Sequence, residues 1–252
     1  MNHTHSSVAA VGYRGQARKA AQDSFFDYKD LTLGGGTGVR YTKGNTYAAP
    51  NGDADDYKKN TSALTTLQRH VAFFDADLDG VVFPWDTFLG FYALGFGFLL
   101  SLIAVNIIHP PFFYQTQPGW IPDPRMPLYI ANMHRDKHGS DSETYDRRGH
   151  FQKQRFDAVF EDWSSAPQKD ALNLSDVLAM CWGRRNIFDF FGIFAFFFEW
   201  GSSYMLLWPQ DGYVTKEDMH GIIDGSIFPV IAARRKKLGA LRKKGPILRS
   251  EQ

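Results

Sequence analysis

The stretch from Asp75 to Asp86, DADLDGVVFPWD, is a twelve-residue loop with aspartates at its first, third and fifth positions. Ca²⁺ is a hard cation that binds about six to eight oxygen atoms, and Gly80 at the sixth position permits the sharp turn that such loops need. The predicted ligands are four carboxylates and one main-chain carbonyl, from Asp75, Asp77, Asp79, Val81 and Asp86. Phe83, at position nine, has no side-chain oxygen, so a water molecule must supply the ligand there. Asp86, at position twelve, has a shorter side chain than the Glu that is usual at this position. We therefore expect a calcium-binding EF-hand of reduced affinity.

A long apolar segment follows this loop directly. From Thr87 to Pro122 the chain contains no Asp, Glu, Lys or Arg. As a helix, residues Phe88 to Ile108 would span about 31 Å at ~1.5 Å per residue, which matches the hydrocarbon core of a membrane. Prolines then recur at Pro110, Pro111, Pro118, Pro122, Pro124 and Pro127. We predict that residues 88–127 form an apolar helical hairpin with a proline-rich turn in a membrane or lipid droplet. A buried helix pair of a soluble protein is the alternative.

The residues before the loop divide into two parts. Residues 1–60 show no sustained apolar period and are expected to form a disordered or loosely ordered arm. Within the predicted EF-hand, residues 61–90, apolar side chains recur at the three-to-four spacing of one helix face, at Leu64, Leu67, Val71 and Phe74. His70 lies on the edge of that face, beside Phe74, because successive helical residues are rotated by about 100°.

The region from 128 to 230 is predicted to be helical and to contain two degenerate EF loops. A helix over Leu128–Lys137 would place His134 on the same side as His138, four residues later. The first degenerate loop, residues 144–155, has Thr144 and Arg148 where carboxylates are needed. The second, LWPQDGYVTKED at residues 207–218, lacks carboxylates at its first and third positions. EF loops associate through short strands, so one or both are expected to pair with the loop at Asp75 to Asp86.

Between these loops, Ile187 to Trp208 is strongly aromatic and is interrupted by Asp189 and Glu199. A helix that is apolar on most faces is either buried in a core or exposed to lipid. Burial in a core is the commoner outcome. A phenylalanine-lined pocket for an acyl chain would have the same sequence.

Composition and charge narrow the classes of partner. The chain has 252 residues and a formal net charge of +1, which gives no general preference for nucleic acid. Residues 231–252 form a basic tail whose one acidic residue is Glu251, so it is either a solvated tail or a contact for an anionic membrane surface. Cys181 is the one cysteine, which excludes an intrachain disulfide and suits a reducing compartment. We expect a buried, unreactive thiol, and no cleavable secretory signal at the amino terminus.

Several long motifs, in order, resemble the caleosin family over residues Leu64 to Phe228. They are LQRHVAFFDADLDGVVFPWDTF, PGWIPDPRMP, MHRDKHGSDSETYD and FFFEWGSSYMLL, followed by DGYVTKE and DGSIF. Caleosins are calcium-binding haem peroxygenases of lipid droplets. The resemblance implies non-covalent haem b, with haem-associated histidines at His70 and His138, and Ca²⁺ in the acidic loop. It also implies a fatty-acid hydroperoxide substrate and a place on the cytosolic face of lipid droplets or the endoplasmic reticulum.

Two functions of different class follow. The enzyme would use a fatty-acid hydroperoxide to hydroxylate, epoxidise or sulfoxidise an acceptor, which requires one proximal ligand and one distal acid–base group. His70 and His138 supply such a pair in either order, or both could ligate iron, with His134 as a competitor or supporting residue. A zinc pair of His134 and His138 is disfavoured because no Glu follows the first histidine. The alternative is a calcium-responsive structural or tethering protein of lipid droplets, and oligomerisation is compatible with both.

Overall fold

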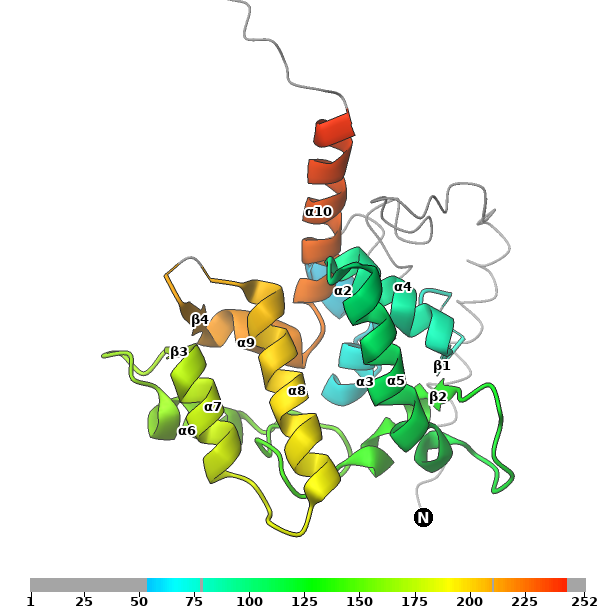
Figure 1. Ribbon diagram of the computed structural model, residues 1–252, viewed down its shortest axis with the longest axis horizontal. Helices are drawn as coiled ribbons and strands as arrows, with labels where there is room; N and C mark the ends of the chain where they lie inside the picture. Colours follow the sequence, from blue (N-terminus) through cyan, green and yellow to red (C-terminus); the bar gives the residue numbers. More distant parts are fainter. Residues whose placement is uncertain (1–53, 78, 210, 244–252) are drawn as a thin grey trace, which may run out of the picture.

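The computed structural model describes residues 54–77, 79–209 and 211–243, and it confirms a mainly α-helical fold (Figure 1). The helices are α2 (Ala54–Asn60), α3 (Thr66–Ala72), α4 (Pro84–Leu94), α5 (Gly97–Thr116), the 3-10 helix η3 (Ile130–Asp136), α6 (Lys153–Trp163), α7 (Leu174–Gly183), α8 (Phe190–Leu207), α9 (Lys216–Ile223) and α10 (Ile227–Lys243). The short strands are β1 (Val81–Val82), β2 (Leu128–Tyr129), β3 (Ala171–Asn173) and β4 (Tyr213–Thr215).

The acidic loop lies between α3 and α4, as the sequence predicts. Thr65 begins α3 with a capping box, in which its hydroxyl accepts a hydrogen bond from the Gln68 amide and the Gln68 side chain accepts one from the Thr65 amide. Gly80 turns the loop at a φ of 85°, a conformation that glycine adopts without steric strain. Pro84 then starts α4 at a position where a missing amide hydrogen is harmless.

The strand pairing differs from the prediction. β1 pairs antiparallel with β2, which follows the apolar region, so neither degenerate loop is the partner of the acidic loop. The loop at residues 207–218 contains β4, which pairs with β3. β3 lies between α6 and α7 in the sequence. Residues 144–155 form no EF loop, because no helix leads into them and Asp146 instead closes a tight turn by accepting the Arg148 and His150 amides.

The apolar region is a helical hairpin, but its turn lies elsewhere than predicted. A single helix over Phe88–Ile108 is wrong because α4 ends at Gly95, whose φ of 95° is left-handed. The amides of Gly95 and Phe96 both donate to the Phe91 carbonyl, which closes the helix end, and Gly97 has a φ of 75°. α5 then packs back along α4 (Figure 1).

The prolines do not form the tip of this hairpin. Pro110 and Pro111 lie inside α5, and the later prolines belong to the segment that carries the chain from α5 to β2. His109 precedes these prolines and is fully buried. Its Nε2 is hydrogen-bonded to the Thr87 hydroxyl at 2.8 Å, and its Nδ1 is hydrogen-bonded to the Met126 carbonyl oxygen at 2.7 Å. These two contacts hold α4, α5 and the proline-containing segment together where proline removes helical hydrogen bonds.

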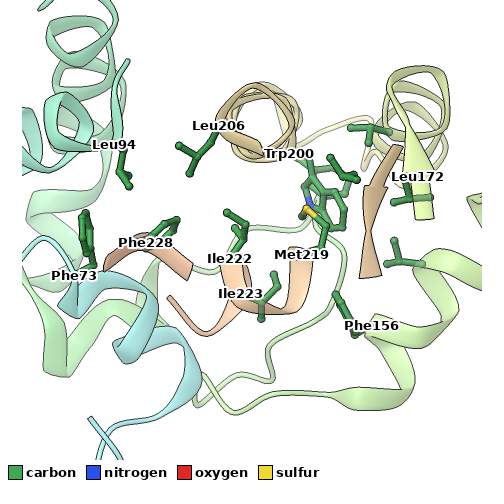
Figure 2. Packing of buried hydrophobic residues seen from close by; sticks show 14 of the residues in the cluster. Phe73, Leu94, Phe156, Leu172, Trp200, Leu206, Met219, Ile222, Ile223 and Phe228 are labelled. Carbon is green, nitrogen blue, oxygen red and sulfur yellow. The ribbon is translucent and has the colours of Figure 1, made fainter. Parts of the chain in front are cut away.

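One hydrophobic core joins both halves of the molecule, with α9 and the start of α10 at its centre. Phe73 of α3 and Leu94 of α4 face Phe228 from one side, and Ile222 and Met219 continue the packing toward α8 (Figure 2). The core then extends to residues of α6 to α8 and β3, including Phe156, Leu172 and Trp200. α9 therefore positions α3 relative to α8.

The described residues begin and end in helices. Residues 54–60 of the predicted arm form α2, in which Tyr57 is completely buried and its hydroxyl donates to the Arg69 carbonyl. Residues 1–53 of the predicted arm lie outside the described residues. Much of the predicted basic tail belongs to α10, which extends away from the body (Figure 1), with Arg234 and Arg235 exposed.

In the part of the chain that the structure describes, two helices, α5 and α8, are long and apolar enough to cross a membrane by length and composition. Only 17% of the apolar stretch of α5 and 28% of that of α8 is buried. On α5, Phe98 and Leu99 are 55% and 66% exposed, and Phe190 of α8 is 79% exposed. α8 therefore packs one face into the core, through Phe196, Trp200 and Leu206, and leaves most of its remaining apolar surface exposed, so it is not the fully buried helix that its composition favoured.

Candidate functional site

The acidic loop gathers three carboxylates. Ligand oxygens of Asp75, Asp77 and Asp79 all lie within 4.8 Å of one another. Asp75 is completely buried and accepts the Asp79 and Gly80 amides at 3.1 and 2.8 Å. Burial raises the pKa of Asp75 well above its usual range, against the Gly80 hydrogen bond, and the neighbouring aspartates add to this effect. A divalent cation would supply the positive charge that this cluster needs.

The remaining predicted calcium ligands lie at the end of the same loop. Val81 begins β1 and pairs with Tyr129 of β2, which fixes the loop backbone at position seven. Asp86 is 7% exposed, and its carboxylate accepts the Phe83 amide at 2.9 Å, so it also caps α4. The donor set of carboxylates and a carbonyl suits Ca²⁺.

His70 lies near the end of α3 with its ring fixed from one side. Its Nδ1 is 2.7 Å from the Ile222 carbonyl oxygen at the end of α9, and its ring meets the Phe228 ring edge-on at 5.2 Å. Because a carbonyl only accepts, Nδ1 carries the hydrogen and Nε2 keeps its lone pair. Burial lowers the pKa of His70, opposed by the Ile222 hydrogen bond, so the ring is neutral. A neutral imidazole with an oriented Nε2 is the form that binds metals.

His138 follows η3 and lies between two carboxylates. Its Nε2 is 3.6 Å from Glu199 Oε1, and its Nδ1 is 4.0 Å from Asp189 Oδ2. Nδ1 is buried and has no hydrogen-bond partner. Burial lowers the pKa of His138, but the interactions with Glu199, Asp141 and Asp189 together outweigh this effect, and the net pKa is raised. This imidazole is therefore better suited to taking up a proton than His70 is.

Asp189 holds its position through backbone hydrogen bonds from two segments. Its carboxylate accepts the Gly139 and Ser140 amides at 2.8 Å and caps α8 through the Gly192 amide at 2.9 Å. The backbone immediately after His138 is thereby attached to the start of α8, although the two segments are far apart in the sequence.

Both histidines line one cavity of about 270 Å³, which α3, α4, α5 and α8 surround. Its walls are mainly aromatic and aliphatic, with Phe91, Phe112 and Trp200 among them. Its apolar lining and its two imidazoles from separate segments are chemically suited to holding a haem group. His70 Nε2 is available as a ligand, and the unpartnered His138 Nδ1 is a buried polar atom that a bound group could satisfy.

Asp136 is a further group of the cavity that the sequence did not reveal. Both of its carboxylate oxygens are buried without a hydrogen-bond partner. Burial raises the pKa of Asp136 to about 7, against the influence of Arg135 and His138. Glu199 and Asp189 were also missed as site residues, although they are the acidic residues within an otherwise aromatic stretch.

Other sequence predictions for the site are corrected or extended. Leu128 and Tyr129 form β2 rather than a helix, and the following 3-10 helix ends at Asp136, so His134 and His138 do not share a helical face. His134 is not among the residues lining the cavity. Cys181 is 1% exposed, and burial raises the pKa of its thiol to about 12, as expected of an unreactive cysteine.

Comparison with known proteins finds relatives whose names refer to peroxygenases. The chain is 41% identical over 181 residues to a peroxygenase of Lilium longiflorum, covering 72% of this chain and 74% of the relative. It is 35% identical over 169 residues to "Probable peroxygenase 4" of Arabidopsis thaliana, covering 67% and 86%. A third relative, at 26% identity over 155 residues (62% and 74%), is the "Probable inactive peroxygenase-like protein" of Arabidopsis thaliana.

No solved structure matches the chain. The family model described as "Caleosin related protein" matches residues 62–232, which include the acidic loop, both histidines and the α4–α5 hairpin. The chain therefore belongs to the caleosin family.

Proposed function

We propose that this caleosin is a calcium-binding haem peroxygenase. It takes a fatty-acid hydroperoxide as oxygen donor and hydroxylates, epoxidises or sulfoxidises lipid and small-molecule acceptors. The peroxygenase names of two relatives support this activity. The observation that carries the proposal is one apolar cavity that receives His70 and His138 from distant segments, with the His70 tautomer set by the Ile222 carbonyl.

The two histidines take different roles in this proposal. His70 is the proximal ligand, because its neutral ring presents Nε2 and the Ile222 hydrogen bond keeps the ring oriented. His138 is the distal group, because Glu199 favours its protonated form and lets it accept a proton from the hydroperoxide and return it to the departing oxygen. A haem held in this cavity by His70 would supply the redox chemistry for O–O bond cleavage and oxygen transfer.

Calcium binds the acidic loop in the same proposal, through Asp75, Asp77, Asp79, Val81 and Asp86. The clustering of three carboxylates around a buried Asp75 supports this site. α3 links the loop to His70, so the ion stabilises the helix that presents the proximal ligand. We place the protein on the cytosolic face of lipid droplets or the endoplasmic reticulum, supported by the exposed apolar surfaces of α5 and α8.

Substitution of the histidines tests the assignment of roles. His70→Ala removes the imidazole that would hold the haem iron, so the purified variant should lose most of its haem and its activity. His138→Ala should keep haem but lose at least about a hundredfold in turnover, the usual contribution of a general acid–base group. His134→Ala, outside the cavity, is the control and should keep both. Full haem content and turnover in both cavity variants would reject the site.

A second candidate function is a non-enzymatic, calcium-responsive tether or coat protein of lipid droplets. The relative named as inactive and the exposed apolar helices favour it. In that case purified protein would bind calcium and lipid surfaces but show no haem absorption and no peroxygenase turnover.

A further inference from the structure

The histidine cavity lies between the two most exposed apolar helices of the described chain. α5 contributes Ile107, Ile108 and Phe112 to its lining, and α8 contributes residues along one face. In Figure 1, α3 is visible between α5 and α8. The outward faces of both helices are largely apolar and exposed, so the surface around the cavity is one that lipid can cover.

Two phenylalanines connect α5 and α8 at this cavity. The Phe112 and Phe191 ring centroids are 5.4 Å apart with the rings at 79°, an edge-to-face contact. Phe191 is 39% exposed, so its ring reaches from the cavity to the surface. On the inner side, its centroid is 6.4 Å from that of His138. The ring pair therefore stands between the outside and the proposed distal group.

We propose that Phe112 and Phe191 form an acyl-chain clamp, through which a long-chain hydroperoxide reaches the cavity from a lipid surface. This inference rests on the proposed peroxygenase function and adds the route and orientation of its substrate. The two rings separate to admit the chain and then pack against its methylene groups. The hydroperoxide group lies beside His138, and the rest of the chain remains between α5 and α8 or in lipid.

The charges lining the cavity define which end of the substrate stays outside. Asp136 and Glu199 are acidic, and the Lys137 ammonium is 3.0 Å from a carboxylate oxygen of Asp141, which pairs with it. A fatty-acid carboxylate inside the cavity would therefore find no unengaged lysine or arginine among the described lining residues, and for the same reason the propionates of a bound haem would have to lie at the mouth of the cavity. The carboxylate end of the substrate accordingly remains at the water–lipid boundary.

The clamp is tested by comparing a long-chain acyl hydroperoxide with tert-butyl hydroperoxide. In Phe191→Ala and Phe112→Ala, kcat/KM should fall about tenfold for the long-chain substrate and less than twofold for the small one, because only the long chain contacts the rings. Phe191→Leu retains an apolar side chain and should recover most of the loss. Phe194→Ala is the matched control, since Phe194 is 51% exposed on the same helix but does not line the cavity.

Binding of a dansyl-labelled long-chain alcohol to the same variants provides a readout that needs no turnover. Its Kd should rise about tenfold in Phe191→Ala and stay unchanged in Phe194→Ala. Three results would each overturn the clamp. They are an unchanged or raised kcat/KM for the long-chain substrate in the clamp variants, an equal loss of kcat/KM for both hydroperoxides, and an unchanged Kd for the labelled alcohol. A wild-type protein that turns over neither hydroperoxide would instead reject the proposed function, while the Kd comparison would still test the clamp.

Discussion

At the residue scale, the two histidines acquire different chemistry from their partners. His70 faces a carbonyl that fixes its tautomer, whereas His138 faces Glu199 and Asp189. The sequence alone left open which histidine is proximal, because both stand in comparable motifs. The distinction comes from α9 and α8, whose contacts with the histidines are formed only in the folded chain.

Glu199→Gln should shift the pH dependence of turnover. The negative charge of Glu199 raises the pKa of His138, so its removal lowers that pKa. If neutral His138 must accept the hydroperoxide proton, the acidic limb of the kcat profile moves to lower pH in the variant. The measurement is kcat against pH for wild type and Glu199→Gln. Glu161→Gln, on the distant helix α6, is the control, and an unmoved acidic limb would separate Glu199 from the proton transfer.

At the element scale, α3 packs against α9, and this contact fixes the position of His70. Gly225 follows α9 at a φ of 76°, and a Cβ atom there would lie 2.8 Å from the Arg69 carbonyl oxygen and 2.9 Å from the His70 Cα atom. Such an approach is possible only for glycine. The DGSIF motif therefore serves the placement of His70.

Gly225→Ala should destabilise the fold and displace His70. Gly212 offers a matched control, because its φ of 81° is similar but a Cβ atom there would meet nothing within 4 Å. Gly212→Ala should lower the free energy of unfolding by about 1–2 kcal/mol from backbone strain alone. Gly225→Ala should lower it by at least about 1 kcal/mol more and also reduce haem content, measured by urea unfolding and absorption. Equal effects of the two substitutions would disprove this close-packing role.

Calcium should stabilise the folded protein through the acidic loop. At a Ca²⁺ concentration about a hundredfold above Kd, one site adds ~2.7 kcal/mol to the free energy of unfolding. Asp75→Ala should abolish this increment. Because α3 contains His70 and leads directly into the loop, chelation of calcium should also alter the haem spectrum. Asp211→Ala, in the loop before β4, is the control. Calcium stabilisation that survives in Asp75→Ala would place the ion elsewhere.

The elements that sequence predicts well are those specified by neighbouring residues. The acidic loop between two helices depends on spacing within twelve residues, and it is found where expected. The sequence prediction placed the hairpin turn at the prolines because they are the strongest helix-breaking signal in this region. Gly95, where the turn lies, stands within a continuous apolar run. The β1–β2 and β3–β4 pairs, and the contact of Glu199 with His138, join distant segments and have no local signature.

At the scale of the whole molecule, the α4–α5 hairpin returns the chain to its starting side. The turn at Gly95–Gly97 reverses the direction, and β2 then pairs with β1 next to the start of α4. Both ends of the hairpin therefore lie at the same end of the pair. This arrangement suits a protein that rests on a lipid monolayer, which has no aqueous far side.

The hairpin geometry predicts a monotopic topology. On microsomes, tags appended to the two ends of the chain should both be removed by added protease, because the proposed topology puts both ends on the cytosolic face. A luminal marker protein, which stays intact until detergent is added, is the control. Protection of one tag but not the other would mean that a helix crosses the membrane.

The central claim is that a single apolar cavity holds haem between His70 and His138. The most direct measurement is the visible absorption spectrum of purified protein, combined with quantification of iron per chain. The account predicts haem absorption in stoichiometric amount, which His70→Ala largely removes. A folded wild-type protein that binds calcium but shows no haem absorption would contradict the claim and favour the tethering function.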